Sequence, residues 1–201
     1  MTTVAAAQAL IMSAVLKPKL TLQEYLDWEN AQEGRHEFVQ GSVLAMTESG
    51  RIHGRVLLNL ASHLAAALAG TRCQVFITSM KVQTAEDTVL YPDVFVTCDA
   101  ADLATDQIFR APTLVIEVLS PSTQAYDRSH KFALYRRISA LREYVLVDPD
   151  TRRVEAFRRN AVGDWMLHDM SDDDAFVAAS LDLIVAMTDV FAGIDPPPEP
   201  A

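Results

Sequence analysis

Apolar residues recur at two different spacings along this chain, and these spacings predict helices alternating with strands. In the segment 51–70 an apolar residue returns at every fourth position: Ile52, Val56, Leu60, Leu64 and Leu68. This spacing predicts one amphipathic helix that ends at Gly70. Near the start of the chain, Thr21 with Glu24 three residues later matches a capping box and predicts a short helix over LQEYLDWEN.

Strands are predicted where short β-branched and aromatic segments lie between turn residues. HEFVQGSVLAM predicts a hairpin, and CQVFITSMKVQT, TVLYPDVFVTC and IFRAPTLVIEVLS predict one strand each. The segment SPSTQAYDRSHKFALYRRIS predicts a turn and a helix, LREYVLVDPDTRRVEAFRRN two strands, and SLDLIVAMTDVFAG a last short strand and helix. This succession predicts a mixed α/β (α+β) single domain over residues 19–194, with a loose arm at 1–18 and a disordered Pro-rich tail at 195–201.

The composition narrows the class of protein further. With 201 residues, half of them hydrophobic, the chain is long enough for one full core, and no apolar run approaches the roughly 18 residues that span a bilayer. The segment MTTVAAAQALIMSAVL has no Lys or Arg before its apolar part, so we expect an arm and not an export signal. The two cysteines, Cys73 and Cys98, form no CxxC motif, which excludes a disulfide scaffold or a zinc ribbon and favours a reducing compartment. We therefore expect a soluble, cytoplasmic protein without a membrane partner.

The charge is unevenly distributed along the chain. The formal net charge is −10 at pH 7, which is unfavourable for a protein coated by nucleic acid. Between Arg128 and Arg159, however, nine Lys and Arg residues stand against four acids. This basic segment is compatible with local phosphate contacts, and equally with a solvated helix face and hairpin.

Two predicted strands each carry one carboxylate among apolar residues. Asp93 lies near the start of the strand in TVLYPDVFVTC, and Glu117 lies in the middle of TLVIEVLSPS. An ionised carboxylate alone in an apolar interior costs several kcal/mol, so each needs a partner. If the strands are neighbours, the two carboxylates converge, and a hard cation such as Mg²⁺ or Mn²⁺ is one partner that would hold them together. The alternative is that each carboxylate pairs with an arginine.

Lys131 follows the Glu117 strand on the next predicted helix. From there its ammonium could extend back to the carboxylates. A lysine beside a carboxylate-bound metal is equipment for phosphodiester hydrolysis, because the metal activates water and the lysine offsets the charge of the transition state. The alternative is an ordinary solvated lysine on a helix.

Three segments of this chain resemble a known family. YPDV, LVIEVLSPSTQAYDRSHKFALYRR and LREYVLVDPDTRRVEAFRR resemble the Uma2 family, which is assigned to the PD-(D/E)XK nuclease superfamily. The similarity extends from about Thr21 to Phe191, and the run EVLSPST with the following YDR, lysine and tyrosine is its most specific part. The resemblance implies a restriction-endonuclease-like fold, with a central mixed β-sheet flanked by helices.

The resemblance also implies roles for particular residues. Asp93 and Glu117 match the acidic positions of the superfamily motif, and position 119, where the motif has its lysine, is Leu119. Lys131 is therefore the first candidate for that lysine, and Lys81 is the second. Glu37 matches an acidic position that often assists metal binding, although it is equally suited to the open face of a hairpin. In this assignment Asp93 and Glu117, with help from Glu37, bind the metal.

His53 completes the candidate residues, because it lies off the apolar stripe of its helix and faces either the site or water. The function implied is a Mg²⁺-dependent endonuclease, with Mn²⁺ as a substitute, that cuts DNA and, by resemblance, works as a homodimer. The alternative is a protein that keeps the nuclease fold without catalysis and binds nucleic acid or another protein. A third possibility is hydrolysis of a different phosphate ester.

Overall fold

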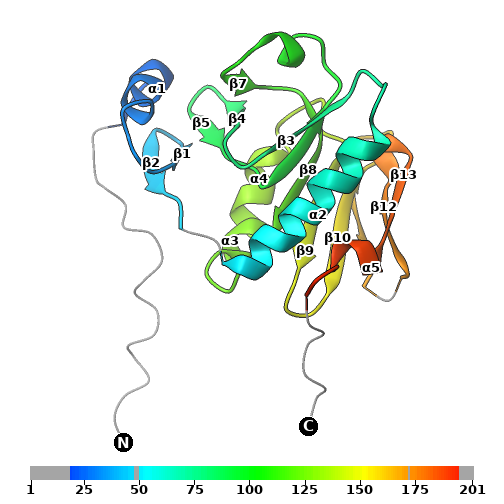
Figure 1. The fold of residues 1–201 in the computed structure, drawn as a ribbon. Helices are drawn as coiled ribbons and strands as arrows, with labels where there is room; N and C mark the ends of the chain where they lie inside the picture. Colours follow the sequence, from blue (N-terminus) through cyan, green and yellow to red (C-terminus); the bar gives the residue numbers. More distant parts are fainter. Residues whose placement is uncertain (1–18, 48–49, 172, 195–201) are drawn as a thin grey trace, which may run out of the picture.

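A six-stranded sheet lies at the centre of the computed structural model, which describes residues 19–47, 50–171 and 173–194 (Figure 1). The arm expected at 1–18 and the tail expected at 195–201 lie outside these residues. The strand order is β11-β10-β9-β8-β6-β3. β8 and β9 are parallel and all other neighbours are antiparallel, so the sheet is mixed, as expected. Its strands are β3 (Gln74–Ile77), β6 (Val94–Thr97), β8 (Pro112–Val118), β9 (Glu143–Asp148), β10 (Arg153–Arg159) and β11 (Trp165–Asp169).

Two smaller sheets accompany the central one. A five-stranded sheet has the order β2-β1-β5-β4-β7, and β12 pairs with β13. The hairpin expected in HEFVQGSVLAM is present, as β1 and β2, with Gln40 and Gly41 at positive φ in its turn. The strands are β1 (His36–Val39), β2 (Ser42–Ala45), β4 (Lys81–Ala85), β5 (Thr88–Leu90), β7 (Ile108–Phe109), β12 (Ala175–Ala178) and β13 (Leu183–Ala186).

Helices cover both faces of the central sheet. On one face, α2 packs its apolar stripe against β6, β8 and β9. Ile52 is an exception to the predicted stripe, because it lies in the first turn of α2 and is 37 % exposed. The capping box of Thr21 and Glu24 is present at the start of α1. None of the helices in the described ranges combines the length and the apolar character needed to cross a bilayer. The α-helices are α1 (Leu22–Glu29), α2 (Arg51–Ala67), α3 (Gln124–Tyr126), α4 (Phe132–Tyr135) and α5 (Met187–Val190).

The opposite face of the sheet is covered by the segment that joins β8 to β9. This segment consists of α3, a π turn (Asp127–Lys131) and α4. Leu134 and Tyr135 pack there against Val115, Leu119 and Leu146 of the sheet side. Since alternate residues of a strand face opposite sides, Glu117 points to the same side as Val115 and Leu119. The π turn therefore lies over the face from which Glu117 projects.

Three of the predicted strands are each divided in the structure, and IFRAPTLVIEVLS is one of them, because it forms β7 of the five-stranded sheet and β8 of the central sheet. CQVFITSMKVQT forms β3 and β4, which belong to different sheets, with Thr78 at a φ of 28° between them. TVLYPDVFVTC likewise forms β5 and β6, with Tyr91, Pro92 and Asp93 between them. Proline has no N–H for a ladder hydrogen bond, so the chain leaves one sheet before it enters the next. Asp93 consequently lies at the crossing between the two sheets.

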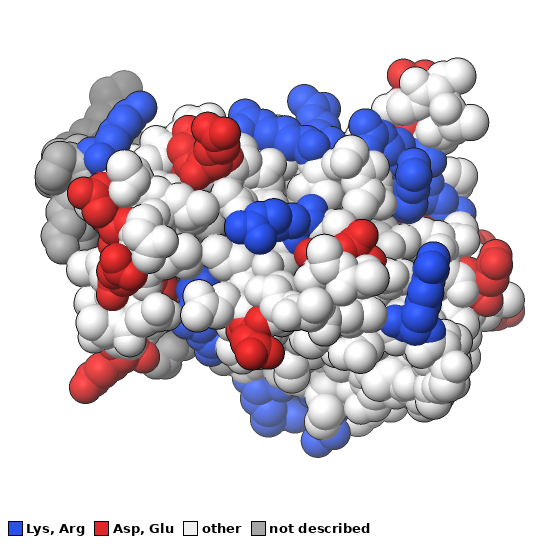
Figure 2. All heavy atoms as spheres, turned by 90° about the horizontal axis from the view of Figure 1, so that it is seen from above, with Lys and Arg blue, Asp and Glu red and all other residues white. Residues whose placement is uncertain are grey.

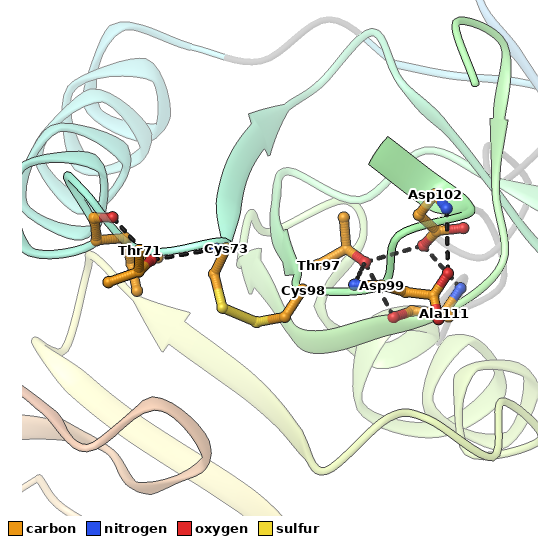
Figure 3. Close-up of a disulfide and its surroundings, with 8 residues drawn as sticks. Thr71, Cys73, Thr97, Cys98, Asp99, Asp102 and Ala111 are labelled. Carbon is orange, nitrogen blue, oxygen red and sulfur yellow. Dashed lines mark hydrogen bonds between the residues drawn. A yellow bond between two sulfur atoms is a disulfide. The ribbon is translucent and has the colours of Figure 1, made fainter. Parts of the chain in front are cut away.

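Cys73 and Cys98 are joined by a disulfide, so the expectation of reduced cysteines is wrong for this structure (Figure 3). The reason is the register of β3 and β6, which pairs Gln74 with Thr97 and so places the two cysteines opposite each other, with their Cα atoms 4.1 Å apart. Disulfides persist in oxidising surroundings, so this pair does not support the expected cytosolic location.

Candidate active site

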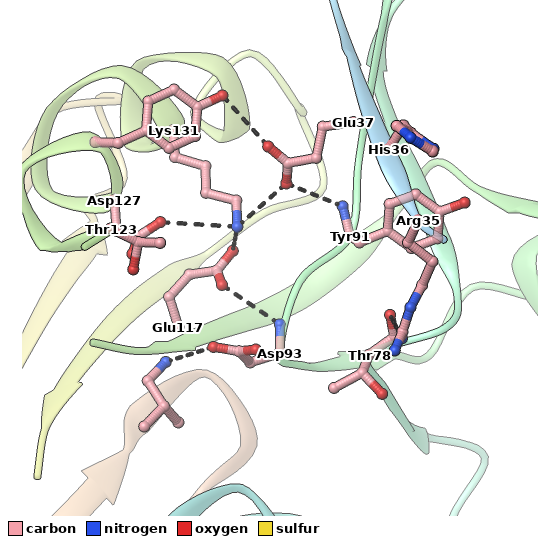
Figure 4. Close-up of polar contacts among 12 residues, drawn as sticks. Arg35, His36, Glu37, Thr78, Tyr91, Asp93, Glu117, Thr123, Asp127 and Lys131 are labelled. Atoms are coloured by element: carbon pink, nitrogen blue, oxygen red, sulfur yellow. Dashed lines mark hydrogen bonds and ion pairs between the residues drawn. The ribbon is translucent and has the colours of Figure 1, made fainter. Parts of the chain in front are cut away.

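Asp93, which directly precedes β6, lies opposite Glu117 of the neighbouring strand β8. β6 and β8 pair antiparallel, with Val94 opposite Ile116, and the next step of this register brings Asp93 to Glu117. The backbone N–H of Asp93 donates to Glu117 Oε2 at 3.4 Å. The backbone N–H of Val118 donates to Asp93 Oδ2 at 2.8 Å. The two carboxylates therefore converge at one point of the sheet (Figure 4).

Neither carboxylate forms an ion pair with an arginine among the described residues. Glu117 is 2 % exposed and pairs with Lys131, whose Nζ lies 3.0 Å from Glu117 Oε1. Burial raises the pKa of Glu117 well above its ordinary value, Lys131 opposes this rise, and the Asp93 carboxylate adds to it. The charge on Glu117 thus depends on a cation beside it.

Lys131 is buried among carboxylates and is not a solvated helix lysine. It is 6 % exposed, and its Nζ lies 3.2 Å from Glu37 Oε1 in addition to the contact with Glu117. Burial alone would lower the pKa of Lys131, but the Glu117 and Glu37 carboxylates outweigh it and hold the pKa well above the ordinary value. The side chain therefore remains an ammonium.

Glu37 projects from β1 into this cluster and not onto an open hairpin face. It is 6 % exposed. Besides Lys131, its carboxylate accepts hydrogen bonds from the backbone N–H of Tyr91 and the hydroxyl of Tyr126, both at 3.4 Å. Burial raises the pKa of Tyr126, and the Glu37 carboxylate raises it further, so the phenol keeps its hydrogen. Both oxygens of Glu37 are thus occupied by donors of this chain.

His53 faces the site. It lies in the first turn of α2, is 9 % exposed, and its Nε2 is 3.0 Å from Asp93 Oδ2. An ionised carboxylate only accepts hydrogen bonds, so Nε2 carries the hydrogen in this contact. His53 and the backbone N–H of Val118 together fix the orientation of the Asp93 carboxylate.

Lys131 and Lys81, the two candidates for the motif lysine that is absent at position 119, have different surroundings in the structure. Lys81 lies with its Nζ 5.6 Å from the centre of the Tyr91 ring and makes no ion pair with any described carboxylate. Leu119 is 4 % exposed and belongs to the apolar cluster beneath α4. Lys131 approaches Glu117 from that same side of the sheet, so its ammonium reaches the carboxylate without a lysine at 119.

Sequence reasoning missed Asp127 and Tyr126. Asp127 is 3 % exposed, and its Oδ1 lies 3.7 Å from Lys131 Nζ. Burial raises the pKa of Asp127, and Lys131 opposes the rise. The spacing of four residues between Asp127 and Lys131 was a usable signal, because such pairs are neighbours on a helix surface. The contact of Tyr126 with Glu37 links positions 89 residues apart and leaves no local pattern.

The donor set fits a hard divalent cation. Three buried carboxylates surround the Lys131 ammonium: Glu37, Glu117 and Asp127. The Asp93 carboxylate, which contacts His53, adds a fourth negative group next to Glu117, so the cluster has an excess of negative charge. In the described part of the chain, no three His, Cys, Asp or Glu side chains form a ready-made metal cage. Mg²⁺ is commonly bound by one or two carboxylates with water and substrate oxygens, so the pair of Asp93 and Glu117 meets its requirement.

The mixed sheet and its flanking helices define a restriction-endonuclease-like fold. A crystal structure described as a "putative nuclease belonging to DUF820" from Anabaena variabilis ATCC 29413 is similar, with a TM-score of 0.72 and 19 % sequence identity, covering 86 % of this chain and 97 % of that one. The sequence profile of the Uma2 family, described as "Putative restriction endonuclease", matches residues 22–188. The chain therefore belongs to the Uma2 family.

Two curated relatives are uncharacterized proteins of Synechocystis sp. (strain ATCC 27184 / PCC 6803 / Kazusa). The protein slr1290 is 34 % identical over 178 residues, which cover 88 % of this chain and 94 % of the relative. The protein sll1609 is 30 % identical over 164 residues, which cover 80 % of this chain and 93 % of the relative. The similarity thus extends over nearly the full length of both relatives.

Proposed function

We propose that this protein is an endonuclease that hydrolyses phosphodiester bonds in DNA with Mg²⁺, or Mn²⁺ as a substitute. The observation that carries the proposal is the position of the Lys131 ammonium, 3.0 Å from Glu117, while Glu117 and Asp93 converge across neighbouring strands. Membership of a family described as a restriction endonuclease supports the same reaction class.

Each residue has a separable task in this proposal. Asp93 and Glu117 hold the metal, which when bound polarises the phosphoryl group and lowers the pKa of a bound water. Lys131 stays charged, so it offsets negative charge on the reacting phosphate and does not act as a base. His53 keeps the Asp93 carboxylate in one orientation. Glu37, on β1, forms a second ion pair with the Lys131 ammonium and so helps to hold it beside Glu117.

The distribution of charge is consistent with DNA contacting a limited part of the surface, and not with DNA covering a large basic surface. On the face in Figure 2, Lys and Arg alternate with Asp and Glu, and the described residues there form no continuous basic surface. Much of the basic segment is used internally, since Arg128 pairs with Glu155 and Arg158 with Glu143. Arg136, Arg137 and Arg142 remain exposed between α4 and β9, where they would meet phosphates.

Cleavage of supercoiled plasmid tests the proposal. We expect nicking or linearisation by the wild type with Mg²⁺ or Mn²⁺ and none with EDTA. Glu117→Gln is expected to abolish cleavage, since it removes a metal-binding charge but keeps the side-chain shape. Activity that survives both EDTA and Glu117→Gln would refute the proposal. Cleavage of a chromogenic phosphodiester, with DNA left intact, would instead indicate a different ester substrate.

The burial of the cluster favours one alternative function, a nuclease fold that binds DNA or a protein without cutting. Glu117 and Lys131 are only 2 % and 6 % exposed. If this alternative holds, DNA binding weakens steeply with salt but is unchanged by Glu117→Gln and by Mg²⁺. We further propose a homodimer, in which two sites would face the two strands of a duplex. Analytical ultracentrifugation with and without DNA tests the dimer.

A further inference from the structure

Asp127 is a buried carboxylate that the proposed reaction does not use. It begins the π turn at the edge of the site, and its side chain is 5 % exposed. Figure 4 shows the Lys131 ammonium with Asp127 on one side and Glu37 on the other, and with Glu117 between them. The distances from Lys131 Nζ are 3.0 Å to Glu117, 3.2 Å to Glu37 and 3.7 Å to Asp127.

The backbone of Asp127 is anchored to the sheet. Its N–H donates to the carbonyl of Thr123 at 2.9 Å. Its carbonyl accepts a hydrogen bond from the Tyr144 hydroxyl, also at 2.9 Å. Tyr144 lies in β9, which pairs in parallel with β8, the strand of Glu117. The backbone positions of Asp127 and Glu117 are therefore both fixed relative to the same pair of strands.

The π turn connects the anchored backbone of Asp127 to Lys131. A π turn replaces the i→i+4 hydrogen-bond pattern by i→i+5, and such turns are frequent at functional sites. A side-chain donor that enters a helix ladder, as the Tyr144 hydroxyl does here, accompanies this kind of distortion. Asp127 and Lys131 are the two ends of the turn, so the carboxylate and the ammonium that it faces are held by one element.

A metal on Asp93 and Glu117 would change the partners of Lys131. The metal would neutralise Glu117 and repel the ammonium. Glu37 would then attract the ammonium toward β1, away from the paired carboxylates. Asp127 opposes that movement because it lies on the other side of the ammonium. A buried carboxylate without a counter-charge is strongly destabilising, so Asp127 in turn requires the lysine.

We propose that Asp127 is a positioning residue, which keeps the Lys131 ammonium beside Glu117 when Glu117 is neutralised. The catalytic consequence rests on the proposed nuclease function. The positional consequence does not, because Glu117→Gln neutralises the same carboxylate without any metal.

Hydrogen exchange of the Lys131 ammonium, followed by ¹H–¹⁵N NMR, tests the positional consequence. In the Glu117→Gln background, we expect Asp127→Asn to raise the exchange rate about tenfold, because a charge-assisted contact is lost. Glu155→Gln is the matched control, since it removes the same charge beside the same turn but contacts Arg128. Asp127→Glu, which keeps the charge, should restore slow exchange. Amide spectra establish that each variant is folded. An unchanged rate in the folded Asp127→Asn variant would overturn the proposal.

Kinetics test the catalytic consequence with Glu117 intact. We expect Asp127→Asn to lower kcat about a hundredfold, as misplaced catalytic groups do, with the Mn²⁺ affinity and KM nearly unchanged. If the wild type cuts no DNA, the proposed function fails, and the exchange measurement alone decides on Asp127. If KM rises while kcat is kept, Asp127 has a binding role and the proposal is overturned.

Discussion

The imidazole of His53 and the carboxylate of Asp93 share one contact across 40 positions of sequence, with Nε2 lying 3.0 Å from Oδ2. The same oxygen accepts the backbone N–H of Val118 at 2.8 Å. Both donors bind Oδ2, and the other oxygen of Asp93, Oδ1, accepts no hydrogen bond from the described residues. The two hydrogen bonds to Oδ2 therefore set the direction in which Oδ1 points. His53 of α2 thus helps to orient the carboxylate of Asp93, which directly precedes β6.

We predict that His53→Ala weakens Mn²⁺ binding about tenfold, because groups that orient metal ligands typically contribute 10- to 100-fold to affinity. Isothermal titration calorimetry measures this loss. His63→Ala is the matched control, since His63 lies on the same helix and is exposed. Equal affinities for His53→Ala and the wild type would show that the contact does not orient the carboxylate.

We predict that Lys131→Met loses cleavage by a factor of about 10² to 10³, the usual effect of removing one group that stabilises charge in a transition state. Lys81→Met removes the same charge from a lysine that lies over the Tyr91 ring and forms no ion pair with a described carboxylate, and it should retain activity. Plasmid cleavage under identical conditions compares the two. Loss of activity in Lys81→Met but not in Lys131→Met would show that Lys81, and not Lys131, is the catalytic lysine.

The same lysine has a measurable effect on stability. At neutral pH, Lys131→Met is expected to lower the free energy of unfolding by about 3 kcal/mol, because it leaves a buried carboxylate without its partner. The double variant Lys131→Met, Glu117→Gln should recover part of this loss, since it removes the buried charge as well. Urea denaturation of the four proteins of this cycle gives the coupling. Additive losses would mean that the two side chains do not interact.

All five tyrosines of the chain are predicted to resist ionisation: Tyr25, Tyr91, Tyr126, Tyr135 and Tyr144. Burial is the largest cause that raises each pKa above the ordinary 10.0, and nearby carboxylates add to it. Above pH 10 the unfolded chain therefore loses protons that the folded chain keeps, so stability falls as pH rises. Absorbance at 295 nm should stay flat until the protein unfolds and then rise together with the loss of circular dichroism. A gradual titration near pH 10 in folded protein would contradict this.

Local patterns predicted the elements that depend on neighbouring residues. The spacing of Val56, Leu60 and Leu64 marked the buried face of α2, and the capping box of Thr21 marked the start of α1. The strand over 165–169 was missed because it is an edge strand that is largely exposed, without the apolar run of a buried strand. The division of the segments 74–85, 88–97 and 108–118 between two sheets was also missed, because alternation along a strand does not indicate which sheet it joins.

The site was predictable only where chemistry was unusual for its surroundings. Glu117 stood out because a carboxylate in a buried strand needs a partner, and its actual partner is Lys131. Tyr126 did not stand out, because a Tyr near the start of a helix is ordinary there, and Asp127 left only its spacing of four residues from Lys131 as a signal. Their function in the cluster arises from contacts with Lys131 and Glu37 that only the folded chain brings together.

Calorimetric titration of Mn²⁺ and Mg²⁺ tests the central claim most directly, because it requires no knowledge of the DNA that is cut. The proteins to compare are the wild type, Asp93→Ala and Glu117→Ala, each titrated alone and with duplex DNA present. We predict binding by the wild type and its loss in both variants. Binding that persists in both variants, or no binding by the wild type even with DNA, would contradict a metal site at the paired carboxylates.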